Sequence, residues 1–453
     1  MTISTIFQGN FFHTQVYGEI DYLPQALVCV NSLGIIEEVI PVTDTRYKSV
    51  LAEAEQQLTV HKFAEDQYIL PGFVDLHVHA PQWPQAGVAL DAPLNVWLDE
   101  CTFPLEASYQ DVAFAEVVYK DLIQQLLSRG TTTVLYFATV HKEASLALAR
   151  LCGELGQRGL VGKVVMDHPT MTPEFYRDET AQQAITETEA FIQEVQAMSS
   201  DYIQGVYPVV TPRFVPSCSD EALAGLGQLA KTYDVHVQSH CSEGDWEHQH
   251  VFERFGRRDT EVLEDFGLLG EKSVMAHCNF LNEEDGAIFQ KTKTAVAHCP
   301  ISNAYFANSV LPVQRLHEQG VTVGLGTDIS GGFSPSLYEN IRQVVMSSRM
   351  LEEGVDTQKV ADERGVGNGR LTVLEAFYLA TTAGGEALSL PIGTFAKGQV
   401  FDAQVIQPNI ASNPLPNFGK FQQPEQLLAK IIYLADQSNI RSVWVQGKQV
   451  HHK

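Results

Sequence analysis

The chain has 453 residues, of which 44% are hydrophobic, and it carries a formal net charge of −25 at pH 7. This apolar content excludes an intrinsically disordered chain, because it is enough to form a large core. The acidic charge repels phosphate backbones and anionic membrane surfaces, so we expect neither nucleic acid nor a membrane among the partners.

The cellular location is predicted from sequence features that are absent, namely a signal peptide, a membrane span and paired cysteines. The first residues, MTISTIFQGNFF, have no basic stretch followed by an apolar run, so no signal peptide is expected. No apolar segment approaches the roughly 20 residues that span a bilayer. The seven cysteines include no CxxC pair and are expected to be reduced thiols, so we expect a cytoplasmic protein.

The two ends of the chain share a pattern of short strand-like segments broken by Gly, Asn and Pro. Residues 1–69 contain LVCVNSLGIIEEVI, and residues 390–453 contain RSVWVQGKQV. We interpret both as parts of one small β-sandwich domain that is assembled from the two ends.

Residues 70–389 alternate short Val-rich runs with segments of helical spacing. The runs lie at 70–79, 131–137, 160–167, 204–213, 235–243, 273–279, 294–300 and 321–328. Eight strands alternating with helices predict the α/β class and an eightfold β/α barrel of the TIM type. A doubly wound open sheet is the alternative, but it leaves the count of eight unexplained.

Polar residues stand at the predicted carboxyl ends of these strands, where barrel enzymes place their catalytic groups. They are His77 and His79 after the first strand, His240 after the fifth, His277 after the sixth and Asp328 after the eighth. The i, i+2 spacing of the first pair puts both side chains on one face of the strand.

This set of residues predicts a metal site. Neutral imidazoles with one carboxylate suit Zn²⁺ and leave a position for water, although iron accepts the same ligands. A single histidine would be interpreted as a core residue, but four of them with an aspartate at strand ends would not. We expect one metal, because the fourth strand ends in VVTPRF with Arg213 and offers no lysine for carboxylation. Lys163 lies inside the third strand and is expected to be structural.

A metal-activated water also needs a group that accepts its proton. Glu243 follows His240 by three residues in the sequence SHCSE and is predicted to shuttle this proton. Asp245 and Glu247 nearby are interpreted as solvated loop acids.

These residues resemble the amidohydrolase superfamily, in particular its mononuclear metal-dependent deaminase branch. The motifs that carry the resemblance are PGFVDLHVH, QSHCSE, VMAHCNF and GLGTD. More selective stretches are similar to the guanine deaminase family, namely HAPQWPQAG, DAPLNVWLDECTFPLE, YFATVH, VGKVVMD, VTPRF and AHCPISN. The unrelated zinc deaminase fold is marked by HxE together with PCxxC, and no PCxxC occurs here.

The resemblance implies a zinc-dependent hydrolase of purine catabolism that converts guanine to xanthine and ammonia, usually as a homodimer. It implies one Zn²⁺ held by His77, His79, His240 and Asp328. Glu243, Asp328 and His277 are the implied catalytic groups, and whether His277 also ligates the metal is left open. His141 and His168 also end predicted strands but receive no role.

The resemblance places Gln82, Arg213 and Phe214 at purine-binding positions. A guanidinium can donate paired hydrogen bonds to O6 and N7 of guanine, and a glutamine amide can both donate and accept. Phe214 or Trp83 could stack on the base.

Two alternatives stay open. The same fold could act as a deaminase or chlorohydrolase on cytosine, an aminotriazine or an adenine-type ring. Arg213 with Gln82 favours a 6-oxopurine, because O6 needs a hydrogen-bond donor. A non-catalytic scaffold of the same fold is the second alternative, and the presence of all expected ligands argues against it.

Overall fold

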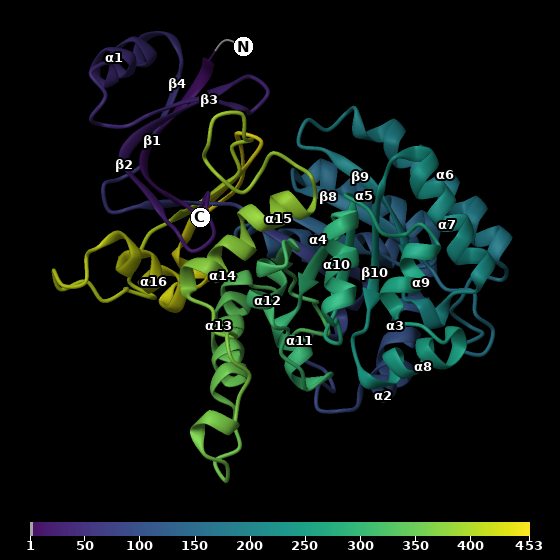
Figure 1. Cartoon of the computed structure of the whole chain (residues 1–453). Helices are drawn as coiled ribbons and strands as arrows, with labels where there is room; N and C mark the ends of the chain where they lie inside the picture. The colour runs from purple at the N-terminus through teal and green to yellow at the C-terminus, as the bar shows by residue number, and fades with distance from the viewer. Residues whose placement is uncertain (1–2) are drawn as a thin grey trace.

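A computed structural model describes residues 3–453 of the chain. The chain forms a β/α barrel with a smaller sheet beside it, and the first and last strands of the chain both belong to that smaller sheet (Figure 1). The predicted fold class is therefore confirmed.

The barrel consists of eight parallel strands that neighbour one another in chain order. They are β6 (Phe73–His79), β7 (Thr131–Phe137), β8 (Arg158–Val165), β9 (Val206–Pro212), β10 (His236–Cys241), β11 (Ser273–His277), β12 (Ala295–His298) and β13 (Val323–Leu325). Each overlaps one of the eight predicted runs. The open-sheet alternative is excluded by the contacts between the first and last of these strands.

The barrel closes through the residues that follow β13. Val78 on β6 pairs with Ile329 in a parallel bridge. The His79 amide donates to the Ile329 carbonyl at 2.9 Å, and the Asp328 amide donates to the His77 carbonyl at 2.8 Å. Closure of the ring thus brings the predicted metal ligands of the first and eighth strands together.

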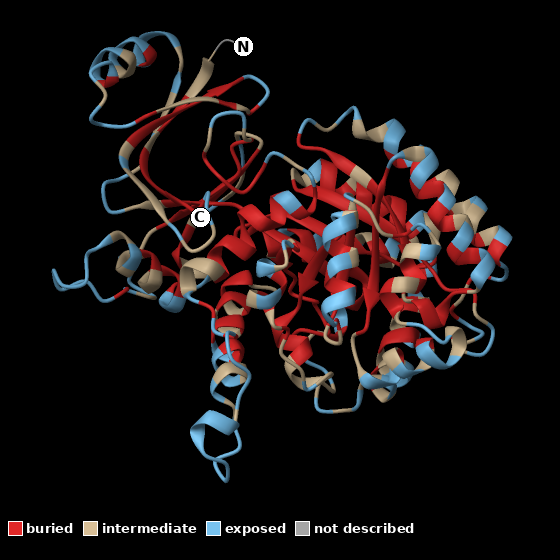
Figure 2. Ribbon diagram, viewed as in Figure 1, coloured by how far each residue is buried: buried red, intermediate tan, exposed pale blue. Residues whose placement is uncertain are grey.

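Helices surround the barrel, with their apolar faces on the strands and their outer faces in solvent (Figure 2). They are α4 (Val112–Leu127), α5 (Lys142–Leu155), α6 (Ala181–Ser199), α7 (Asp220–Tyr233), α8 (Asp245–Phe255), α9 (Asp259–Asp265), α10 (Glu283–Thr292), α11 (Pro300–Tyr305), α12 (Val313–Glu318), α13 (Leu337–Glu353), α14 (Val373–Ala380) and α15 (Thr382–Ala387). Between β6 and α4 lie the short helices α2 (Leu94–Trp97) and α3 (Phe103–Ala107). None of the helices in residues 3–453 is long and apolar enough to cross a membrane.

Helix α7 illustrates how the sequence determines where a helix begins, which side it buries and where it ends. The Ser219 hydroxyl accepts a hydrogen bond from the Ala222 amide and so caps the first turn. Leu223, Leu226 and Leu229 recur at helical spacing and are buried. The helix ends at Asp234, whose left-handed conformation, with φ of 52°, turns the chain toward β10.

The smaller sheet joins both ends of the chain, as predicted. Its strands are β1 (Ile3–His13), β2 (Asp21–Asn31), β3 (Ile36–Ile40), β4 (Thr59–Lys62), β5 (Tyr68–Pro71), β14 (Ala403–Ile406), β15 (Ile440–Val445) and β16 (Lys448–His452), with helices α1 (Tyr47–Gln57) and α16 (Pro424–Leu434) attached. Antiparallel pairing of β5 with β14 connects the two parts. Hydrogen bonds link all eight strands into one continuous mixed sheet, so the expected sandwich is a single sheet by its hydrogen bonding. The boundaries 1–69, 70–389 and 390–453 stay a prediction.

A buried ion pair connects the sheet to the amino-terminal end of the barrel. The Arg158 guanidinium at the start of β8 pairs with the Asp402 carboxylate, which precedes β14. It also donates to Thr133 Oγ1 at 2.9 Å and Gln446 Oε1 at 2.8 Å. Loss of one partner leaves the other charge buried without compensation.

We therefore expect Asp402→Asn to lower the free energy of unfolding by about 3 kcal/mol, measured by urea denaturation. The pair of Arg46 with Asp44, 2.7 Å apart, provides the control, because the arginine is exposed and the aspartate is partly exposed, and Asp44→Asn should leave the denaturation midpoint unchanged. Equal midpoints for the two variants would contradict a stabilising role for the buried pair.

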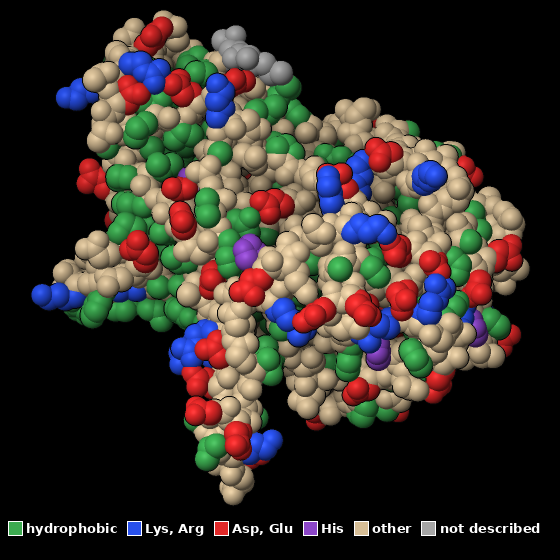
Figure 3. Space-filling model, viewed as in Figure 1, with side chains coloured by type: hydrophobic (Ala, Val, Ile, Leu, Met, Phe, Trp, Pro, Cys, Tyr) green, Lys and Arg blue, Asp and Glu red, His purple; other side chains and the backbone are tan. Residues whose placement is uncertain are grey.

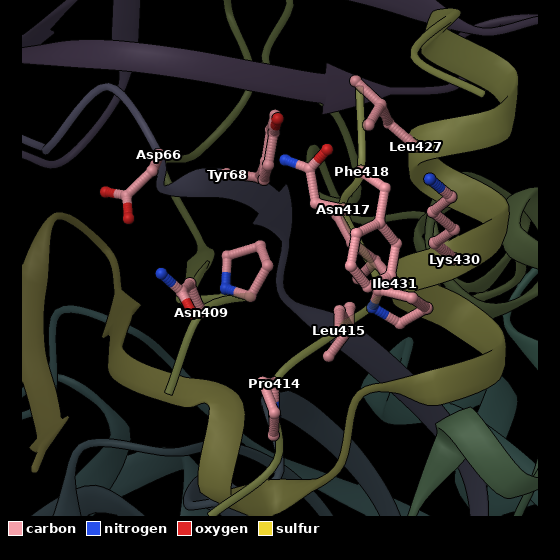
Figure 4. A pocket seen from close by; sticks show the side chains of 12 residues that line it. Asp66, Tyr68, Asn409, Pro414, Leu415, Asn417, Phe418, Leu427, Lys430 and Ile431 are labelled. Carbon is pink, nitrogen blue, oxygen red and sulfur yellow. The ribbon is translucent and has the colours of Figure 1, made fainter. Parts of the chain in front are cut away.

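Two surface features lie outside the barrel's carboxyl end. On the face in Figure 3, lysine and arginine side chains are interspersed with acidic ones. A cavity of about 460 Å³ lies between β5, residues 408–418 and α16, and Asp66 and Lys430 are its charged lining residues. Figure 4 shows the side chains that line it. The remaining lining side chains are uncharged, so this cavity offers neither the imidazoles nor the carboxylate cluster of the predicted metal site.

Candidate active site

The predicted site residues meet at a cavity of about 810 Å³ at the carboxyl end of the barrel. Those that line it are His79, Gln82, Arg213, Phe214, His240, Glu243, His277 and Asp328. His77 lies just beneath and is 1% exposed. Residues predicted from five different strands therefore share one cavity.

The four predicted metal ligands have the separations that one ion requires. His79 Nε2 lies 3.0 Å from His240 Nε2, while Asp328 Oδ1 lies 3.2 Å from His77 Nε2 and 3.6 Å from His79 Nε2. Two atoms that ligate one tetrahedral zinc ion at about 2.1 Å are roughly 3.4 Å apart. The buried His77 Nε2 also has no hydrogen-bond partner among the described residues. The residues thus fit a bound metal ion.

A hydrogen bond outside the cluster determines which ring nitrogen of His240 can bind a metal ion. Its Nδ1 lies 2.5 Å from the Arg213 carbonyl oxygen, which can only accept, so Nδ1 carries the proton. The lone pair of Nε2 then points at the cluster, as a metal ligand requires.

Burial keeps the three imidazoles neutral. It lowers the pKa of His77, His79 and His240 well below the usual value, and neighbouring positive groups, including Arg213, lower it further. Neutral histidine is the form that binds a metal ion. Burial also raises the pKa of Asp328, against the attraction of His277.

Asp75 supports the cluster from below, a contribution that the sequence had not indicated. Its carboxylate accepts hydrogen bonds from the Thr327 amide at 2.9 Å and the Thr327 hydroxyl at 2.6 Å. Because Thr327 precedes Asp328, these bonds hold the loop that carries the carboxylate ligand. Asp75 precedes His77 by two residues on the same buried strand.

Glu243 is placed beside the cluster in the cavity wall. Its Oε2 lies 3.7 Å from His277 Nε2. Burial raises the pKa of Glu243 to about 8, the charge of Asp328 adds to this rise, and Arg213 opposes it. A carboxyl group with a pKa in this range can both take up and release a proton near neutral pH.

His277 is oriented by Asn303 of α11, another residue that the sequence had not indicated. His277 Nδ1 lies 2.8 Å from Asn303 Oδ1, which accepts, so Nδ1 is the protonated nitrogen. His277 Nε2 then faces Glu243 and lies 4.0 Å from Asp328 Oδ2. This separation exceeds the three distances given above for the four-residue cluster.

The residues predicted to bind the base form another part of the cavity wall. Arg213 directly follows β9, and Phe214 lies next to it with its ring 6.4 Å from that of His240. Gln82 lies in a 3₁₀ turn, Ala80–Gln85, that follows β6. Both Gln82 and Arg213 bond to Glu106, which is completely buried and which the sequence had not singled out.

Trp83 does not belong to this set. Its indole Nε1 donates to Asp121 of α4 at 2.7 Å, and it is not among the described residues that line the cavity. Successive side chains of a 3₁₀ helix point about 120° apart, so Gln82 and its neighbour Trp83 face different directions. Stacking of Trp83 on a substrate is therefore not supported by its position.

The remaining candidates lie outside the cluster. Lys163 Nζ bonds to Asp178 at 2.9 Å and is buried, in line with a structural part. His141 precedes α5, and His168 contacts Thr170 at 3.4 Å. Neither histidine is among the described residues that line the cavity.

Comparison with known proteins agrees with this geometry. The model of the Amidohydrolase family matches residues 68–450. The chain is 37% identical to the guanine deaminase of Homo sapiens, covering 99% of this chain and 97% of that protein, and 35% identical to that of Dictyostelium discoideum, covering 99% and 98%. A crystal structure of guanine deaminase from C. acetobutylicum, with guanine bound in its active site, superposes with a TM-score of 0.86 at 31% identity over 99% of this chain and 100% of that one.

Proposed function

Because the chain belongs to the amidohydrolase family, we propose that it is a guanine deaminase, which hydrolyses guanine to xanthine and ammonia. One observation carries the proposal: the His79, His240 and Asp328 cluster shares a cavity with Gln82 and Arg213. Guanine bound in the active site of the relative from C. acetobutylicum, which matches 99% of this chain, supports the same substrate.

We propose that His77, His79, His240 and Asp328 hold one zinc ion per chain. Three neutral imidazoles with one carboxylate match the ligand preference of zinc, and iron is the alternative with the same ligands. A zinc ion bound there supplies Lewis acidity that lowers the pKa of water to about 7. Lys163 is engaged with Asp178, which supports a single metal.

In the proposed reaction, Glu243 removes a proton from the attacking water and delivers it to the ring nitrogen next to C2. The new C–O bond forms at C2 of guanine. Asp328 accepts the second proton and helps to pass it to the amine, so the C–N bond breaks and ammonia leaves. The raised pKa of Glu243, about 8, suits a group that is protonated and deprotonated within one cycle.

The other residues bind and orient the base. His277 Nε2 lies within 4.0 Å of carboxylate oxygens of both Glu243 and Asp328, and His277 hydrogen-bonds the reacting group through this nitrogen. Phe214 provides an aromatic face in the cavity wall, on which a purine can stack. Gln82 and Arg213 bond to the edge of the base.

The direct test is ammonia release from guanine, adenine and cytosine by the purified protein. We expect turnover of guanine with kcat/KM at least about 100-fold above that for the other two bases, since a site built to hydrogen-bond one edge rejects analogues that lack it. Elemental analysis of the same sample should give one zinc per chain. Turnover of only a pyrimidine or a triazine would overturn the substrate, and a metal-free protein that zinc does not activate would favour a scaffold.

The proposal includes a cytoplasmic homodimer that takes part in purine catabolism. All seven cysteines are free thiols, six of them buried, which supports a reducing compartment. Size-exclusion chromatography with light scattering would test the dimer.

A further inference from the structure

Glu106 is a buried carboxylate that organises the base-binding wall without lining the cavity. It lies on α3 and is 0% exposed. Its Oε1 accepts from Gln82 Nε2 at 3.0 Å and from one terminal nitrogen of Arg213 at 3.2 Å, and its Oε2 accepts from the other at 2.5 Å. Tyr176 also hydrogen-bonds to it. No step of the proposed reaction uses this residue.

The carboxylate determines which end of the Gln82 amide faces the substrate. An ionised carboxylate can only accept, so the NH₂ group of Gln82 must point toward Glu106. The carbonyl Oε1 is therefore the free end of the amide. It is buried and has no hydrogen-bond partner among the described residues. Gln82, a residue of the cavity wall, thus has an unsatisfied acceptor at the end of its amide that faces away from Glu106.

The Glu106 carboxylate also determines which N–H groups of Arg213 remain free. A guanidinium has five N–H groups, and the bidentate contact with Glu106 engages two of them. The remaining N–H groups are free to donate. The pair also balances one positive with one negative charge, so Arg213 acts here as an oriented donor and not as a site for an anion.

We propose that Glu106 is a positioning residue that sets base specificity, by fixing Gln82 as an acceptor beside Arg213 as a donor. This inference rests on the proposed function and deepens it. The wall then matches a base edge with an N–H next to a carbonyl oxygen, which guanine and hypoxanthine have at N1 and O6. Adenine has the opposite pattern at this edge, because its N1 accepts and its 6-amino group donates. With its ring in the same position, the lone pair of adenine N1 would face the lone pair of Gln82 Oε1.

The test is the binding of hypoxanthine and adenine to the metal-loaded protein by isothermal titration calorimetry. Hypoxanthine has no amine at C2, so its affinity is measured without turnover. In Glu106→Gln the amide at 106 can donate as well as accept, and the Gln82 amide is free to turn over. We expect the affinity for hypoxanthine to fall about 10- to 100-fold, because a hydrogen bond to a charged group is lost. The affinity for adenine should change much less. The KM for guanine should rise more than kcat falls.

Two further variants separate positioning from stability. Glu106→Asp keeps an acceptor-only group and should recover part of the preference for hypoxanthine. Asp402→Asn removes the carboxylate from the other buried arginine pair, so it should lower stability and leave the preference unchanged.

The outcomes distinguish this inference from the proposed function. Unchanged discrimination in Glu106→Gln, with an active wild type, overturns the inference alone. A wild type that neither binds hypoxanthine nor deaminates guanine overturns the function. If Glu106→Gln does not fold, Gln82→Met removes the acceptor itself, and an unchanged preference for hypoxanthine in that variant overturns the inference.

Discussion

The Glu243→Gln variant is expected to keep its metal and to lose about 10²- to 10⁴-fold in kcat with guanine. The amide has nearly the shape of the carboxyl group but cannot take a proton from water and return it to the ring. Glu243 contributes no atom to the four-residue cluster of proposed ligands, so metal content should not change. Steady-state ammonia release and elemental analysis of the same preparation give the two readouts.

Asp245 provides the control for this substitution. It follows Glu243 by two residues, begins α8 and also lines the cavity, but its side chain is exposed. Asp245→Asn replaces a nearby carboxyl group by an amide in the same way and should change kcat no more than a few-fold. A zinc-loaded Glu243→Gln enzyme with wild-type kcat would show that another group moves the proton.

Local sequence pattern was sufficient to predict the barrel and the cluster of proposed metal ligands. Strands of a parallel barrel all end at one face, so a residue that ends a predicted strand is placed near the others without knowledge of their pairing. His77, His240 and Asp328 were found in this way, although they lie 163 and 88 residues apart along the chain. Pairing within the smaller sheet could not be predicted, because alternation along a strand does not specify its neighbours.

Residues between the strands were less predictable. Glu106 lies in the short helix α3, where its spacing resembles that of any helical acid, and only the folded chain brings it to Arg213, 107 residues later. Asn303 and Asp75 likewise act through residues that are adjacent only in three dimensions. Trp83 directly follows Gln82 in a 3₁₀ turn, so its side chain points about 120° away from that of Gln82 and does not line the cavity. Spacing in the sequence does not distinguish two such neighbours.

Removal of one proposed metal ligand is the second substitution that we expect to reduce kcat strongly. His240→Ala deletes a nitrogen that lies 3.0 Å from His79 Nε2 and that the Arg213 carbonyl holds with its lone pair toward the cluster. We expect metal content to fall from one per chain to near zero. The loss of metal-ion catalysis is worth several kcal/mol, so kcat should fall by about 10³-fold or more.

His236 is the matched control for this variant, because it is a second buried histidine on the same strand, β10. Its Nε2 lies 2.9 Å from the Leu388 carbonyl oxygen, toward the other end of the strand, and it contributes nothing to the cavity. His236→Asn should therefore keep both metal and turnover, even if it is less stable. If both variants lost metal equally, the loss would reflect a damaged strand and not a missing ligand. A His240→Ala protein that still held one zinc per chain would show that His240 is not required as a ligand. Among the described residues, His77, His277 and Cys299 would then be a candidate set, since their ligand atoms all lie within 4.8 Å of one another.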